Sequence, residues 1–139
     1  GGKDLENLRR YVRKYKCEDF IYVIGHVDNL NILMKENNIS CLSSNFESFG
    51  LSLFEGVIFG HLGIGSNVTG IKDVSNIDKL AVLFKNGDYK ELSEIFWNIY
   101  KNEKFYIEFS QTANKIAKKQ FSSERYLKQF MKFIDKIEK

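Results

Sequence analysis

Hydrophobic and polar residues follow two kinds of pattern along the chain, and each kind predicts a different element. Apolar residues three or four positions apart form one stripe over residues 4–16, which predicts an amphipathic helix. Short apolar runs predict strands, and an unbroken run such as residues 20–24 favours a strand that is covered on both faces, as in a parallel sheet. The predicted strands are residues 20–24, 39–42, 62–66 and 80–84.

Helices are predicted between these strands. Asp28 or Asn29 can cap a short helix that ends at Lys35, and a second helix covers residues 51–59. Because strands alternate with helices, the pattern predicts an α/β fold with a parallel sheet and right-handed connections.

The character of the chain changes after the turn signal Asn86-Gly87, and three helices are predicted to follow. Asp88 can cap the first, and Ser122 or Ser123 can cap the third, which runs to about residue 137. Their apolar stripes contain, in order, Leu92, Ile95, Phe96 and Ile99; Phe105, Phe109, Ala113 and Ile116; and Tyr126, Phe130, Phe133 and Ile134.

Composition narrows the class of protein. The 139 residues suit one compact domain, and 43% hydrophobic with 14% aromatic residues is a globular composition that excludes a disordered chain. The net charge of +3 comes without a dense basic cluster, so no nucleic-acid partner is expected. No apolar run approaches the length of a membrane span, and the two cysteines, Cys17 and Cys41, fit a reducing compartment. We therefore expect a cytoplasmic protein.

The common metal and phosphate motifs do not fit this sequence. His26 and His61 lack the spacing of Cys, His or carboxylate ligands that a zinc site needs, so no metal is expected. Residues 65–72 approach a P-loop, but Ile71 stands where the essential lysine belongs, and we reject this interpretation.

The most informative stretch is residues 43–56, between a predicted strand end and a predicted helix start. A parallel sheet places its ligand crevice at such a position, and a helix start offers unpaired amides to a phosphate group. Gly50 lets a ligand approach the backbone closely, and the carboxylates of Glu47 and Glu55 can accept hydrogen bonds from sugar hydroxyls. The alternative is that Glu47 only caps the helix and that Glu55 is a surface residue. Spacing alone does not decide between them.

This stretch resembles the donor-binding C-terminal domain of retaining GT-B-type glycosyltransferases of the class called group 1. Members read Ser-x-x-Glu-x-Phe-Gly-x-x-x-x-Glu-(Ala/Gly), the E-x7-E motif. Its positions are matched here by Ser44, Glu47, Phe49, Gly50, Glu55 and Gly56. The flanking residues 23–27 and 60–73 are similar to the family's neighbouring segments, so the resemblance covers essentially the whole chain. Among the departures, Gly63 and Gly65 replace larger residues, which we expect to loosen the loop near the donor.

The resemblance implies a fold, a reaction and roles for single residues. The fold is a Rossmann-like parallel sheet flanked by helices, with further helices at its C-terminal end. The reaction moves a sugar from a nucleoside-diphosphate donor to an acceptor hydroxyl with retention, without a metal or cofactor. Glu47 is then the catalytic residue that holds the transferred sugar, and Glu55 holds the ribose of the donor. Backbone amides of Ser48, Phe49, Gly50 and Leu51 would hold the diphosphate, and Gly25, His26 and Val27 would border the base.

The resemblance also implies that residues 1–139 form a single, partial domain, with the acceptor-binding N-terminal domain of the same protein as its partner. We expect the isolated chain to be inactive and the last predicted helix to pack on that N-terminal domain. A peripheral contact at the inner face of the cell membrane is the alternative for this helix. The expected role is polysaccharide or glycoconjugate synthesis. Two other functions stay open: a nucleotide-sugar epimerase of GT-B architecture and a non-catalytic α/β interaction module.

Overall fold

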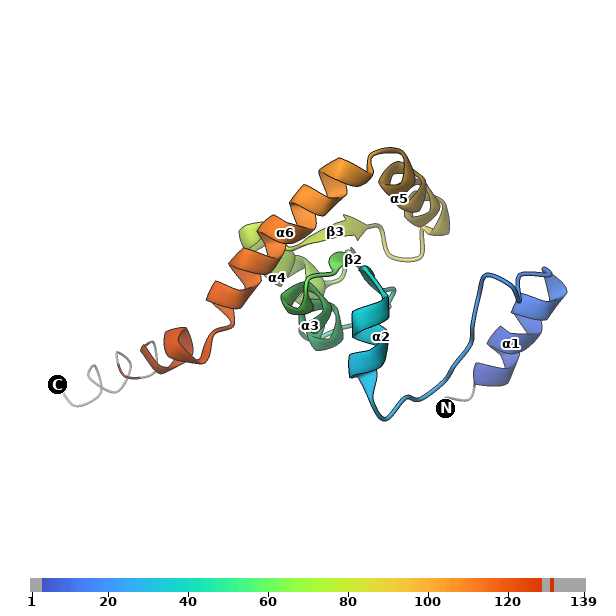
Figure 1. Ribbon diagram of the computed structural model, residues 1–139, viewed down its shortest axis with the longest axis horizontal. Helices are drawn as coiled ribbons and strands as arrows, with labels where there is room; N and C mark the ends of the chain where they lie inside the picture. Colours follow the sequence, from blue (N-terminus) through green and yellow to red (C-terminus); the bar gives the residue numbers. More distant parts are fainter. Residues whose placement is uncertain (1–3, 129–130, 132–139) are drawn as a thin grey trace. The chain divides into compact units, whose positions relative to one another are not determined.

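The computed structural model describes residues 4–128 and 131 of the chain (Figure 1). The chain divides into two compact units, Gly1–Leu33 and Met34–Lys139. Helix α2 (Leu30–Glu36) crosses the boundary between them, and the Asn29 side chain caps it by accepting a hydrogen bond from the Asn31 amide at 3.1 Å.

The described part of the first unit contains helix α1 (Leu5–Lys14), turns at residues 15–16 and 18–20, and then residues 21–27 without regular secondary structure. The helix is stabilised on its surface by Glu6, which accepts a hydrogen bond from Arg13 at 2.8 Å. The strand predicted at residues 20–24 is wrong, because these residues form no strand in the structure. A strand needs a hydrogen-bonded neighbour, and the described part of this unit offers none. The apolar run is therefore open to solvent, with Phe20 83% exposed and Tyr22 75% exposed.

A three-stranded parallel sheet forms the centre of the second unit, with the strands in the order β1-β2-β3. Its elements after α2 are β1 (Ile39–Leu42), α3 (Leu51–Phe59), β2 (Leu62–Ser66), α4 (Thr69–Asp78), β3 (Ala81–Phe84), α5 (Tyr89–Lys101) and α6 (Glu103–Gln120). The three predicted strands of this unit are confirmed, and β3 begins one residue later than expected. The predicted α/β fold with a parallel sheet is also confirmed. Helix α4 was not predicted.

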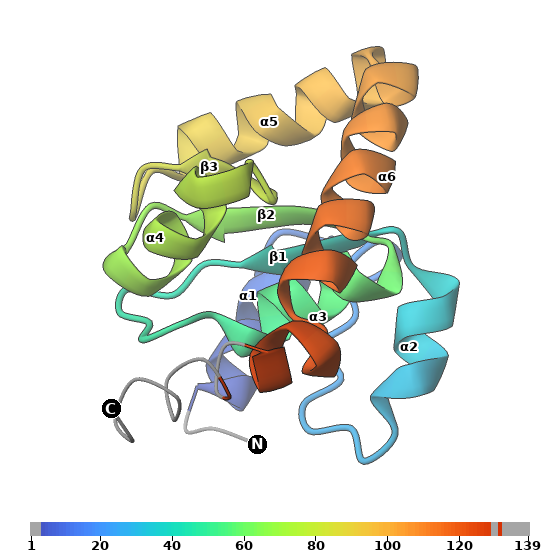
Figure 2. The same ribbon diagram turned by 90° about the vertical axis from the view of Figure 1, so that its left-hand side faces the viewer.

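Two apolar clusters cover the two faces of the sheet. On one face, Ile64 and Phe84 pack with Ile95 of α5, and on the other face α3, α4 and α6 contribute the buried residues. Figure 2 shows α5 on the β3 side of the sheet and α6 running from the end of α5 past β2 to α3. The sheet is thus a layer between helices, as the alternating pattern predicted.

Two glycines let helices approach the central strand closely. A Cβ on Gly63 would lie 2.7 Å from Val57 Cγ2, and one on Gly65 would lie 2.9 Å from Leu53 Cδ2. Because side chains alternate along a strand, both glycines face α3 while Ile64 faces the opposite cluster. Their effect in this structure is to bring the buried side chains of α3 against the sheet.

Local capping signals are confirmed in the C-terminal helices. The Asp88 side chain accepts hydrogen bonds from the Lys90 and Glu91 amides, both at 3.1 Å, at the start of α5. Residues 123–128 and 131 are helical, and the Ser122 hydroxyl accepts a hydrogen bond from the Arg125 amide. Three members of the last predicted stripe lie outside the described residues: Phe130, Phe133 and Ile134. Among the described helices, none has the length and hydropathy needed to cross a membrane.

Candidate functional site

The loop of residues 43–50 leaves the carboxyl end of β1 and leads into α3. It is attached to the segments that follow the other two strands. The buried Ser66 hydroxyl at the end of β2 donates to the Ser44 carbonyl at 2.6 Å, and the Asn86 side chain after β3 donates to the Asn45 carbonyl at 3.5 Å. These contacts place the loop at the edge where the carboxyl ends of parallel strands meet, the usual ligand-binding edge of such sheets.

The start of α3 presents backbone amides that lack partners in the described part of the chain. Gly50 is the N-cap residue, and its φ of 82° lies in the left-handed region that glycine adopts without strain. The amides of residues 48–51 donate no hydrogen bond to any described residue. Because a helix N-terminus also carries partial positive charge, this turn is suited to an anionic group such as a diphosphate.

Glu47 and Glu55 both have free carboxylates among the described residues. Glu47 is half-buried in the loop, and its side chain caps no helix amide, so the alternative of a capping role is wrong. Glu55 is exposed on α3, about 6 Å along the helix axis from Leu51, which lies on the same helix face. Exposure of Glu55 fits both a ligand-binding role and the surface alternative.

Phe49 connects the loop to the rest of the second unit. Its ring lies 5.8 Å from the Phe54 ring of α3 and 5.9 Å from the Phe121 ring at the end of α6, both in edge-on arrangements. The side chain thus anchors the loop, while the predicted role of Phe49 concerns its amide. Leu51 is 66% exposed at the start of α3.

The remaining predicted site residues belong to the first unit. Gly25 has a φ of 76°, in the left-handed region that favours glycine, but residues 21–27 form no turn, and a Cβ at Gly25 would lie 3.3 Å from Leu5 Cδ2. His26 is exposed, with its Nε2 atom 3.4 Å from the Asp28 carboxylate, and Val27 is half-buried. Their contact with a donor base stays a prediction.

His61 is a structural residue. It is only 4% exposed, and its two ring nitrogens lie 2.8 Å from the Ser40 hydroxyl and 2.7 Å from the Met34 carbonyl. A carbonyl oxygen only accepts, so Nε2 donates to Met34, while Nδ1 shares a hydrogen bond with the Ser40 hydroxyl. Both nitrogens are therefore used within the protein.

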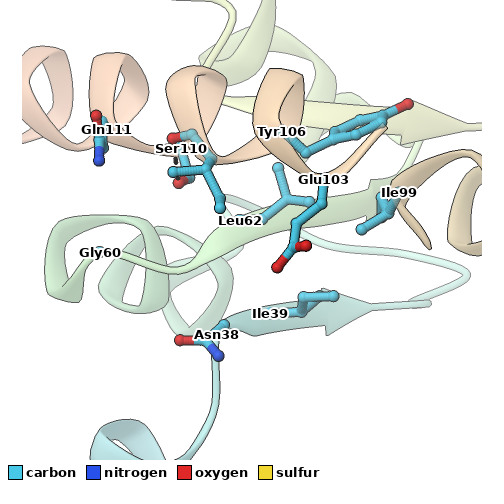
Figure 3. A pocket seen from close by; sticks show the side chains of 10 residues that line it. Asn38, Ile39, Gly60, Leu62, Ile99, Glu103, Tyr106, Ser110 and Gln111 are labelled. Atoms are coloured by element: carbon cyan, nitrogen blue, oxygen red, sulfur yellow. Dashed lines mark hydrogen bonds between the residues drawn. The ribbon is translucent and has the colours of Figure 1, made fainter. Parts of the chain in front are cut away.

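One cavity of the second unit lies away from the loop. It has a volume of about 510 Å³ and opens at the amino ends of the strands, where Asn38, Ile39 and Leu62 line it. Figure 3 shows Glu103 reaching from α6 toward Ile39. The loop of residues 43–50 leaves the opposite end of β1, so this cavity contains no residue of the predicted site.

Sequence reasoning missed three residues that hold the loop, namely Ser66, Gly70 and Asn86. The Gly70 amide donates to the Glu47 carbonyl at 3.1 Å. Gly70 lies in the segment that resembles a P-loop, so a glycine signal was present, but its contact is with the polypeptide.

Comparison with known proteins decides the family. The family model described as "Glycosyl transferases group 1" matches residues 1–120. The chain belongs to the group 1 glycosyltransferases. The resemblance seen in the sequence is thereby confirmed at the level of the family, and neither the epimerase nor the non-catalytic module is favoured.

One relative is the N-acetyl-alpha-D-glucosaminyl L-malate synthase of Bacillus anthracis, which is 27% identical over 129 residues. The match covers 93% of this chain and 34% of the relative, so the chain spans about a third of that protein.

Two solved structures share the fold of this glycosyltransferase chain. The Anabaena protein HepE in complex with UDP matches with a TM-score of 0.85 and 16% identity over 95% of this chain and 36% of its own. A sucrose-phosphate synthase from Thermosynechococcus elongatus matches with a TM-score of 0.80 and 19% identity, over 95% and 34% of the two chains.

Proposed function

We propose that the protein carrying this chain transfers a sugar from a nucleoside-diphosphate donor to an acceptor hydroxyl, with retention of configuration. The observation that carries the proposal lies at the end of the loop and the start of α3, on the carboxyl side of the strands. The amides of residues 48–51 and the carboxylates of Glu47 and Glu55 have no hydrogen-bond partner there among the described residues. Membership of the group 1 glycosyltransferases agrees with it. The HepE structure is a complex with UDP, which supports a nucleoside diphosphate as the class of ligand.

In this proposal the amides of Ser48, Phe49, Gly50 and Leu51 hold the diphosphate. Negative charge grows on the diphosphate as the bond to the sugar breaks, and fixed amide dipoles stabilise that charge without having to reorient. The partial positive charge of the α3 N-terminus acts in the same direction. Stabilisation of the leaving group is then the main contribution of this chain to the rate.

Glu55 binds the ribose hydroxyls in this proposal, and Glu47 contacts the transferred sugar. The exposed position of Glu55 one turn into α3 leaves its carboxylate accessible to a ligand whose phosphates lie at the helix start. The half-buried Glu47 lies in the loop itself, just before these amides, which supports a contact with the donor near its diphosphate. Contact of residues 25–27 with the base stays a prediction from the family resemblance.

The proposal extends to the setting of the reaction. A second, N-terminal domain of the longer protein supplies the acceptor site, and the transfer needs no metal. We place the protein in the cytoplasm, in the synthesis of a polysaccharide or glycoconjugate. Any contact with the inner face of the cell membrane is peripheral in this proposal.

Two substitutions in the longer protein test the proposal. Glu55→Gln removes a charged acceptor from the ribose, so we expect affinity for the free nucleoside diphosphate and for the intact donor to fall together. The loss is roughly 1.5–3 kcal/mol, about ten- to a hundredfold in affinity.

Glu47→Gln alters only the contact with the transferred sugar. Nucleoside-diphosphate affinity should therefore stay near that of the wild type while kcat falls. Calorimetry with UDP and other nucleoside diphosphates, together with steady-state kinetics, measures both effects.

Glu108→Gln is the matched control, because Glu108 is an exposed glutamate on α6. It should leave nucleotide affinity and kcat unchanged. If Glu47→Gln and Glu55→Gln both behave like this control, the motif is only scaffolding at the start of α3 and the donor site lies elsewhere.

A further inference from the structure

We propose that Ser66 and Gly70 are positioning residues for Glu47. We call these two residues the seat, because they hold the backbone of the loop of residues 43–50 against the end of β2 and the first turn of α4. This inference rests on the proposed function, because it assigns the seat a role through the contact between Glu47 and the transferred sugar. Neither residue belongs to the motif, and both lie on the chain after α3.

Gly70 is required at its position for space. It lies in the first turn of α4, and its φ is not in the left-handed region, so any residue could adopt its backbone conformation. A Cβ at this position would collide with backbone atoms of Glu47 and Ser48. Backbone atoms cannot rotate out of the way as a side chain can, so even one methyl group must displace the loop.

Gly70 also binds the loop directly. Its amide donates a hydrogen bond of 3.1 Å to the Glu47 carbonyl. The next residue, Ile71, is fully buried and lies under Gly50, where a Cβ would come within 2.9 Å of Ile71 Cγ1. The first turn of α4 therefore supports the loop at Glu47 and again at the start of α3.

Ser66 forms the second part of the seat, at the end of β2. Its side chain is completely buried, and its hydroxyl donates to the Ser44 carbonyl at 2.6 Å. This bond holds the loop where it leaves β1, three residues before Glu47. The loop is thus held at Ser44 by Ser66 and at Glu47 by Gly70.

The seat matters because no polar contact holds the Glu47 side chain within the part of the chain that the structure describes. Its carboxylate makes no hydrogen bond to a described residue, so the position of the Glu47 backbone decides where the charge lies. A displacement of about 1 Å at a reacting group can cost on the order of a hundredfold in rate. A small change at Ser66 or Gly70 should therefore reach the reaction through Glu47.

The test is a double-mutant cycle on kcat in the longer protein. Gly70→Ala and Ser66→Ala are each combined with Glu47→Gln, and each variant is first shown to be folded by its urea unfolding midpoint. We expect Gly70→Ala to lower kcat about tenfold or more and Ser66→Ala to lower it less. In the Glu47→Gln background both substitutions should have almost no further effect on kcat, because the group that they position is already disabled.

Gly63→Ala is the matched control. It adds the same methyl group to β2 and crowds the side chains of Val57 and Ala81, away from the loop. It should lower stability while its effect on kcat stays small and independent of Glu47. If Gly70→Ala does not fold, Ser66→Ala, which adds no atom, is judged by the same criterion.

Additive effects of the seat and Glu47 substitutions would overturn the inference, since they would show that the seat residues support only the general fold. The same coupling in Gly63→Ala would overturn it too. A Glu47→Gln protein with wild-type kcat would contradict the proposed role of Glu47 itself. A Glu47→Gln protein with reduced kcat but additive cycles would contradict only the positioning role of Ser66 and Gly70.

Discussion

At the scale of single residues, position 50 requires glycine for two reasons: its backbone φ is positive, and a side chain there would have no room. Its φ of 82° is strained for any residue with a Cβ, at a cost of about 1–2 kcal/mol. A Cβ would in addition press on the buried Ile71, and overpacking of this kind costs about 1–3 kcal/mol. The two effects act on the same turn that presents the free amides of residues 48–51.

We therefore expect Gly50→Ala to lower the free energy of unfolding by about 2–5 kcal/mol. The control is Gly87→Ala, because Gly87 has a similar φ of 79° and no heavy atom near the position of the added Cβ. Gly87→Ala should cost only the backbone part, about 1–2 kcal/mol. Urea unfolding of the two variants measures the difference, and equal losses would contradict the close contact with Ile71.

At the scale of elements, the docking of α6 on α3 depends on small and polar residues. Ala113 and Ala117 are buried and let the two helices approach. The Asn114 side chain between them donates hydrogen bonds to the Val57 and Ile58 carbonyls, at 2.8 and 2.6 Å. These carbonyls lie in the last turn of α3, where helix carbonyls lack partners within the helix. The Val57 carbonyl also accepts from the Gly60 amide at 3.1 Å, so Asn114 is its second donor. One side chain thus caps α3 from another element.

Replacing this amide should loosen the two helices. We expect Asn114→Ala to lower the free energy of unfolding by about 1–3 kcal/mol, because the Ile58 carbonyl loses its donor and the Val57 carbonyl keeps only the Gly60 amide. Asn98→Ala is the control, since Asn98 is exposed on α5 and its side chain makes no hydrogen bond to a described residue. Thermal or urea unfolding compares them, and a loss in Asn114→Ala no greater than in the control would exclude the capping role.

At the scale of the whole molecule, this chain supplies the donor-binding part of the proposed site. It matches 34% of the Bacillus anthracis relative, and the proposed acceptor site belongs to another domain. In such an arrangement the donor and the acceptor meet only when both domains are present, because the rate depends on holding the reacting atoms together.

We therefore expect the 139-residue chain by itself to transfer no sugar. Incubation with a panel of nucleotide sugars and hydroxyl acceptors, followed by product analysis, checks this expectation, and the longer protein serves as the positive control. Metal-independent transfer by the isolated chain would show that the acceptor site lies within these residues.

Local rules were enough for much of the fold and part of the candidate site. The strands at residues 39–42 and 62–66, the helix at 51–59 and the caps at Asp88 and Ser122 follow from short apolar runs and from side chains that reach amides two or three residues away. The loop before α3 was also located from sequence, because a strand end next to a helix start is a local pattern.

Only the tertiary structure decided the remaining features, since each depends on contacts between distant residues. Residues 20–24 have the pattern of a strand but find no partner in the described part of their unit. Helix α4 has no side-chain cap, and burial of Ile71 against the sheet compensates for its weak local signal. The Ser66 hydroxyl meets the Ser44 carbonyl across 22 positions of sequence, and Gly70 meets Glu47 in the same way. Such pairs form only after the sheet brings the ends of its strands together, so no local sequence pattern predicts them.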